Sequence, residues 1–271
     1  MKRHQTGRPP DHRLMMLAAK KAGDLMFPNT SPSPSRAIGL VAVLFLTGCA
    51  YSYQARHVSP TSFLGPSASL LEKGKTRDDP LLIYRRAGTA WASYDKIIVD
   101  PIEIWTTDTS RSTAEWSDIQ KLADDFHQTL MEKLGGSYRI VETSQPGAIR
   151  MRLAMIDAKP ARAAFRVAKE VAPYSGVTVA DAAWTFITGK PAFSGEVSIE
   201  YMINDSATGE LLAAGADRRV GGDQIGRATF TTWGDAKNIL TLWSDLAAYR
   251  LCLDRDGKDC RRPSAGLIER P

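Results

Sequence analysis

Residues 196–220 read EVSIEYMINDSATGELLAAGADRRV and carry a clear strand–turn–strand pattern. Apolar side chains stand at positions 197, 199, 201 and 203, and polar ones stand at 196, 198 and 200. A period of two is typical of a strand with one buried face. Residues 204–209 (NDSATG) supply turn residues, so residues 210–220 can return beside the first strand. The stretch therefore predicts a β-hairpin.

Further strands are predicted on the N-terminal side of this hairpin. Residues 150–157 alternate in the same way, with apolar side chains at 151, 153 and 155. Residues 81–84 (LLIY) predict a short strand, and residues 96–105 (KIIVDPIEIW) predict a longer one. Proline has no backbone N–H and would remove a ladder hydrogen bond from the longer strand. We therefore expect a bulge or a sheet edge at Pro101.

Two amphipathic helices are predicted. In the first, apolar side chains recur at 119, 122, 126, 130 and 134, and Gly135-Gly136 then ends the run. We expect Asp235 to cap the second, whose apolar stripe falls at 239, 242, 243, 246, 249 and 253. Several strands follow one another without a helix between them. The elements predict an α+β domain over residues 81–254, with both helices packed on a mixed or mostly antiparallel sheet.

Residues 159–192 fit this scheme least well. They begin basic and alanine-rich and turn apolar over residues 177–187, which include Trp184 and Phe186. We interpret the segment as a small helical insertion that covers one sheet edge. A patch that binds a partner or touches a membrane is the alternative.

The N-terminal part has the order of a signal peptide. Residues 37–46 (AIGLVAVLFL) are uncharged and apolar, with Arg36 before them. Ten residues in a helix span about 15 Å, roughly half of a bilayer's hydrocarbon core, so a permanent transmembrane helix fits poorly. We expect residues 1–48 to be a cleaved signal peptide. Met26 offers an alternative start with a leader of more usual length, and residues 1–25 would then not be made.

The residues after the apolar run resemble the lipobox of bacterial lipoproteins. They read Leu46-Thr47-Gly48-Cys49, and the resemblance implies cleavage before Cys49 and lipidation of its thiol. Two or more acyl chains would hold the protein firmly on a membrane. Ala50 favours the outer membrane, because lipoproteins retained at the inner membrane typically carry Asp there. A buried strand that ends in Gly-Cys is the alternative.

Residues 49–80 are predicted to be the lipidated N-terminus and a tether. They mix Ser, Pro, Gly and charged residues with short apolar patches such as Phe63-Leu64 and Leu70-Leu71. Such a composition is typical of a linker with local docking points.

The charge distribution argues against nucleic-acid binding. The net charge is +5, and residues 1–48 carry all of the excess, with seven Lys/Arg against two acidic residues. The remainder carries 28 basic and 28 acidic side chains. Without a net positive field, general affinity for phosphate loses its main source. We therefore expect no nucleic-acid partner.

Cys252 and Cys260 are predicted to form a disulfide. They flank a polar, glycine-containing loop at the end of the second helix, and an oxidising periplasm would join such a pair. A metal site is the alternative, but two thiols without a nearby histidine seldom suffice. Residues 255–271 are predicted to form a C-terminal tail.

Motifs of common enzymes are missing from the sequence after residue 49. It contains no GxSxG, HExxH, phosphate-binding loop or dinucleotide fingerprint. His127 flanks the first apolar stripe, where packing is the usual role. The neighbours Asp124 and Asp125 point about 100° apart on a helix and indicate a solvated face. We expect a non-enzymatic protein without metal or cofactor.

Several motifs resemble an uncharacterised family of Gram-negative lipoproteins, known as a domain of unknown function. The likeness covers roughly residues 60–250 and implies an envelope lipoprotein with no assigned activity. We interpret Asp100, Trp105, His127 and Arg218, which fall in motif positions, as structural. A weaker likeness to periplasmic lipoproteins that bind assembly machines concerns the fold only. The motifs are YDKIIVDPIEIW (94–105), LADDFHQ (122–128), GSYRIV (136–141), TGELLAA (208–214) and Asp217-Arg218.

These observations together predict an outer-membrane lipoprotein whose domain faces the periplasm. Its membrane contact would be the lipid on Cys49, and the domain would bind or scaffold another envelope protein. Two alternatives stay open at this point. One is an envelope hydrolase with an unfamiliar site, and the other is a carrier of lipid or a small ligand, which predicts an apolar cavity.

Overall fold

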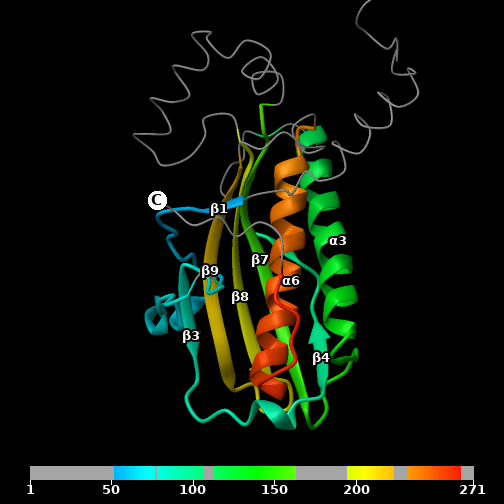
Figure 1. Cartoon of the computed structure of the whole chain (residues 1–271). Coiled ribbons are helices and arrows are strands. Elements are labelled where there is room, and N and C mark those ends of the chain that lie inside the picture. The colour runs from blue at the N-terminus through cyan, green and yellow to red at the C-terminus, as the bar shows by residue number, and fades with distance from the viewer. Residues whose placement is uncertain are drawn as a thin grey trace, which may run out of the picture. The chain divides into compact units, whose positions relative to one another are not determined.

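The computed structural model describes residues 52–76, 78–106, 111, 113–162, 194–222 and 231–263. All of the described elements belong to one compact unit, residues 48–271 (Figure 1). The predicted signal peptide, Cys49 and most of the predicted insertion lie outside the described residues.

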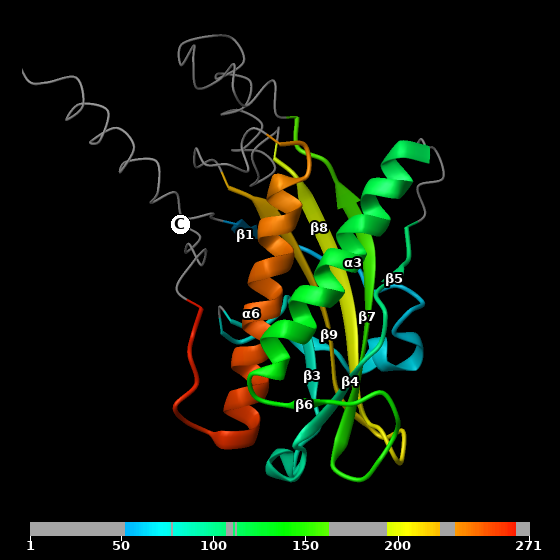
Figure 2. The same cartoon turned by 90° about the vertical axis from the view of Figure 1, so that its right-hand side faces the viewer.

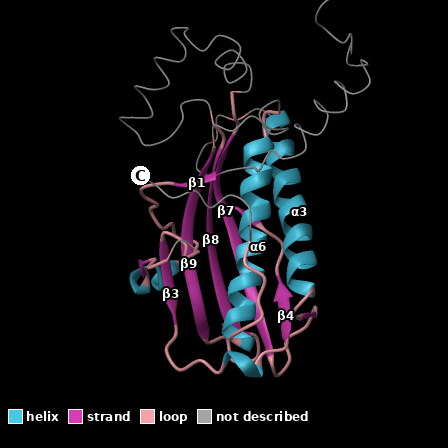
Figure 3. Cartoon of the chain, in the orientation of Figure 1, coloured by secondary structure: helices cyan, strands magenta, loops and turns pink. Residues whose placement is uncertain are grey.

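Nine strands of the described chain form one sheet, in the order β2-β3-β9-β8-β7-β4-β6, with β1 added to β9 and β5 added to β7. Three long central strands dominate it (Figure 3). The strands are β1 (Ser52–Gln54), β2 (Glu72–Lys73), β3 (Leu82–Arg85), β4 (Lys96–Val99), β5 (Glu103–Ile104), β6 (Arg139–Ile140), β7 (Ala148–Lys159), β8 (Glu196–Asp205) and β9 (Leu211–Gly221).

The predicted hairpin is the centre of the sheet. Strands β8 and β9 pair antiparallel, and β8 also pairs antiparallel with β7. Asp205 closes the turn because its Oδ1 accepts hydrogen bonds from the backbone N–H groups of Ala207 and Thr208, both at 2.9 Å. Gly209 has φ of 76°, a left-handed conformation that glycine adopts without steric cost. The side-chain alternation therefore identified the right strands.

Strands β4 and β5 replace the single strand predicted over residues 96–105. Both pair parallel with β7, which makes the sheet mixed. The chain leaves the ladder between them, where Pro101 lies. Proline has no backbone N–H to donate, so a break in the ladder at this position leaves no hydrogen bond unmade. The expected bulge or sheet edge would have had the same effect.

Two helices cover one face of the sheet, as predicted. They are α3 (Thr113–Gly135) and α6 (Gly234–Asp256), and they lie side by side over β7, β8 and β9 (Figure 2). Their apolar stripes and the facing side chains of the sheet form the main core, which includes Phe126, Leu130, Ile149 and Ile239. The predicted α+β class is confirmed.

Asp235 does not cap α6, contrary to the prediction. The N-cap residue is Trp233, and no side chain caps the helix there. Asp235 is buried in the first turn, and its Oδ2 accepts a hydrogen bond from the backbone N–H of Gly195 at 2.7 Å. It also lies against Gly221, where a Cβ would overlap the carboxylate. The residue thus ties the helix to the ends of β8 and β9.

The N-terminal segment belongs to the folded domain, whereas the sequence predicted a tether. Strand β1 pairs with β9 from Ser52↔Gly221 to Gln54↔Arg219. Phe63 and Leu64 are buried on the face of the sheet opposite the helices, against the alanines Ala154, Ala214 and Ala216. A short 3-10 helix, η1 (Gly65–Leu70), follows them. Small alanine side chains allow the segment to approach the sheet closely.

A buried carboxylate holds this segment in place. Glu200 on β8 is fully buried, and its two oxygens accept hydrogen bonds from the backbone N–H of Thr61 at 2.6 Å and from the Thr61 hydroxyl at 2.9 Å. Burial raises the pKa of Glu200, and the hydrogen bonds from Thr61 and Leu64 oppose that shift. The contacts at Glu200 fix the segment's position along β8.

Candidate functional site

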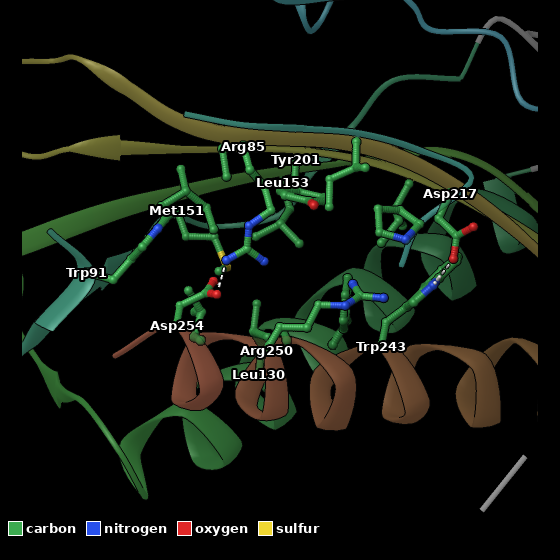
Figure 4. A pocket seen from close by; sticks show the side chains of 18 residues that line it. Arg85, Trp91, Leu130, Met151, Leu153, Tyr201, Asp217, Trp243, Arg250 and Asp254 are labelled. Carbon is green, nitrogen blue, oxygen red and sulfur yellow. Dashed lines mark hydrogen bonds and ion pairs between the residues drawn. The ribbon is translucent and has the colours of Figure 1, made fainter. Parts of the chain in front are cut away.

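A cavity of about 70 Å³ lies between α6 and the helix-covered face of the sheet (Figure 4). Ligand pockets for drug-sized molecules usually reach about 300–1,000 Å³, so this cavity has room for a small group. Its wall is largely apolar, with side chains from β7, β8, both helices and the 3-10 helix η2 (Trp91–Ser93). They include Trp91, Leu130, Met151, Leu153, Ile199 and Trp243.

Two arginines reach into the cavity from opposite walls. Arg85 extends from β3 and forms an ion pair with Asp254 at the end of α6. Arg250 lies one helical turn before Asp254 and also lines the cavity. The Nε atom of Arg250 is buried and has no hydrogen-bond partner. Burial is the largest cause that lowers the pKa of Arg85, and the nearby charge of Arg250 lowers it further.

Asp217 closes the inner end of the cavity as the centre of a buried network. Its Oδ2 accepts from the indole N–H of Trp243 at 2.8 Å and from Arg219 Nε at 3.3 Å. Its Oδ1 accepts from Gln54 Nε2 at 2.8 Å and from the backbone N–H of Leu81 at 3.1 Å. Four donors from β1, β9, α6 and the chain before β3 therefore converge on one carboxylate.

Tyr201 lies beside the arginines, on β8. Its ring covers Gly215, its register partner on β9. A Cβ at Gly215 would come within 2.6 Å of the ring. Glycine therefore leaves room for the ring of Tyr201, whereas any other side chain would clash with it. Burial raises the pKa of Tyr201 to about 12. Its phenol keeps its proton at neutral pH.

Cys252 and Cys260 form a disulfide, with their Cα atoms 5.8 Å apart. Between them α6 ends and Gly257 adopts φ of 71°. The bond joins the last turn of α6 to the chain that follows the helix. Cys49, the other predicted site, lies outside the described residues.

The four motif residues make structural contacts away from the cavity. Asp100 pairs with Arg150 on β7 at 2.8 Å. A ring nitrogen of His127, Nε2, lies 3.1 Å from the carbonyl oxygen of Val99. Trp105 donates to Glu103 Oε2 at 2.9 Å and stacks edge-on against Phe63, and Arg218 pairs with Glu196.

Sequence reasoning missed both cavity arginines. Arg250 follows Leu246 by four positions and precedes Leu253 by three, so it interrupts the apolar stripe of α6. A charged residue inside such a stripe is the signal that could have marked the site. Arg85 carries no comparable signal, because it ends a short strand.

The described residues contain no group of three or more His, Cys, Asp or Glu side chains placed to hold a metal ion. None of the described helices is long and apolar enough to cross a membrane.

Comparison with known proteins identified one family and several solved structures. The family model "Protein of unknown function (DUF3313)" matches residues 59–247. No curated protein matches. The chain covers 94% of PelC from Paraburkholderia phytofirmans, solved as a dodecamer, with 60% of its own length, 13% identity and a TM-score of 0.32.

Two other solved structures are similar in part. The chain covers 92% of protein XCC0632 from Xanthomonas campestris, of family DUF330, with 64% of its own length, 8% identity and a TM-score of 0.35. It covers 89% of lipoprotein GNA1162 from Neisseria meningitidis with 50% of its own length, 11% identity and a TM-score of 0.23. Likenesses at this level carry no inference about what the chain binds.

Proposed function

The chain belongs to the DUF3313 family of proteins of unknown function, and we propose for it the role of a lipid-anchored outer-membrane protein. Its periplasmic domain is non-enzymatic and binds or scaffolds another component of the cell envelope. The lipid on Cys49 is its contact with the membrane, and the bound component is an envelope protein.

The observation that carries this proposal is the short distance along the chain from Cys49 to the sheet. Strand β1 begins at Ser52, three residues after Cys49, and is paired with β9 from its first residue. Three residues span at most about 10 Å. A lipid on Cys49 would therefore hold the end of the sheet that carries β1 at the membrane surface.

The disulfide supports a compartment outside the cytoplasm. Cys252 and Cys260 are joined at the end of α6, and such bonds persist in oxidising compartments such as the periplasm. The predicted signal peptide and the disulfide thus both support export of the chain from the cytoplasm.

The polar groups of the cavity support binding over acid–base catalysis. Asp217 already accepts four hydrogen bonds, and Tyr201, with a pKa of about 12, keeps its proton at neutral pH. A general acid or base works best when its pKa lies near the operating pH. Turnover of an envelope substrate by the purified protein, abolished by a single substitution, would contradict the non-enzymatic role.

Sorting between the two membranes tests the proposed location. We expect the wild-type protein in the outer-membrane fraction of a density gradient from a Gram-negative host. Ala50→Asp should move most of it to the inner-membrane fraction, because Asp at this position is typical of retained lipoproteins. Ala50→Ser is the matched control and should sort like wild type. Wild-type protein in the inner-membrane or soluble fraction would contradict the proposed location.

A further inference from the structure

We infer that the cavity between α6 and the sheet binds an aliphatic carboxylate, whose charged end pairs with Arg250 while its hydrocarbon part lies against the apolar wall. The inference goes beyond the proposed anchoring and does not depend on it, because every group involved belongs to the described domain.

Arg250 is the arginine of this cluster that lacks a carboxylate partner among the described residues. Arg85 is paired with Asp254, and Arg219 is paired with Asp217. Arg250 forms no ion pair with any residue of the described chain, and its buried Nε has no hydrogen-bond partner. An anion in the cavity would supply the missing ion pair.

The chemistry of that arginine favours a carboxylate. A guanidinium is the group that best recognises a planar anion through two parallel hydrogen bonds. The two Nη groups of Arg250, which have no hydrogen-bond partner among the described residues, are such a donor pair. A carboxylate there would give Arg250 the ion pair that it lacks.

The wall and the size of the cavity limit the rest of the ligand. Leu153, Ile199 and Met151 offer a hydrocarbon surface. An anion without an apolar part would gain no binding free energy from contact with it. A cavity of about 70 Å³ holds on the order of five water-sized groups. The five tail carbons of hexanoate fill this volume, which leaves its carboxylate beside Arg250 at the edge of the cavity, and a longer chain would extend out of it.

Calorimetric titration of the full chain, purified in a non-ionic detergent, tests the inference. We expect hexanoate to saturate one site with a Kd of roughly 1 mM or below. Hexanol lacks the charge and acetate lacks the tail, so each should bind at least about tenfold more weakly. Absence of saturable hexanoate binding, or equal binding of hexanol, would overturn the inference.

Three variants separate the site from unspecific effects. Arg250→Met should weaken hexanoate binding about tenfold or more while its Tm stays at or above that of wild type, because the unpaired group is removed. Ala247→Leu keeps the charge but fills the cavity, since Ala247 lines it, and should also abolish binding. Arg261→Met removes the same charge from an exposed position and should bind like wild type. Unchanged affinity in Arg250→Met, or an equal loss in Arg261→Met, would contradict the assignment.

Discussion

Replacement of Asp217 by alanine should lower the free energy of unfolding by about 3–5 kcal/mol. The change leaves the guanidinium of Arg219, only 2% exposed, without its carboxylate in a buried site. It also removes the acceptor of the Trp243 indole and the Gln54 amide. The effect is large because a buried charge without a partner keeps its full desolvation cost.

Urea denaturation followed by circular dichroism measures this effect. Asp125→Ala is the matched control, because Asp125 pairs with Lys237 at 2.9 Å on the protein surface. Exposed ion pairs contribute about 0–1 kcal/mol, so this variant should unfold close to wild type. A loss below about 1 kcal/mol in Asp217→Ala would show that the buried network does not hold the sheet to α6.

Phe63→Ala should lower the free energy of unfolding by about 3 kcal/mol or more. Phe63 is 6% exposed. Its ring centroid lies 5.6 Å from that of Trp105 and 5.3 Å from the guanidinium carbon of Arg152. The substitution removes these contacts and leaves a void between the N-terminal segment and the sheet.

The same segment supplies the control for this prediction. Leu70 lies in η1 and is 46% exposed, so Leu70→Ala should change stability by about 0.5 kcal/mol or less. Equal, small effects of both substitutions would mean that residues 58–71 are a tether after all.

The central hairpin and both helices could be predicted because their side-chain patterns are local. Alternation over residues 196–203 and a helical stripe from Ile119 to Leu134 each report one buried face without knowledge of the partner surface. The fold class follows from the order of such elements. Strand pairing with β7 and the parallel addition of β4 depend on contacts that no local pattern records.

The N-terminal segment was predicted as a tether with docking points such as Phe63-Leu64, and its integration into the sheet was missed because the signal for it lies elsewhere in the chain. Phe63 and Leu64 are two apolar residues in a Ser-rich and Pro-containing stretch, which alone predicts a linker. They are buried because β7 and β9 offer Ala154, Ala214 and Ala216 on the opposite face of the sheet. Only the assembled sheet brings these alanines together.

The candidate site was harder to predict than the fold. Asp235 stands where the sequence predicts a helix cap, but its carboxylate instead accepts a hydrogen bond from the backbone N–H of Gly195. Arg250 carried a weak signal as a charge within an apolar stripe, and its meaning depends on Arg85, which lies 165 positions away. A site between a helix and a sheet is a tertiary feature, and its residues share no motif.

The intact mass of the protein tests the proposed lipidation of Cys49 most directly. Wild type and Cys49→Ala are expressed in a Gram-negative host with labelled palmitate and fractionated, and their intact masses are measured by mass spectrometry. We expect a membrane-bound wild-type chain that begins at Cys49 with the added mass of its acyl groups, and no label in Cys49→Ala. An unlabelled wild-type chain that retains residues 1–48 would contradict the proposed lipidation.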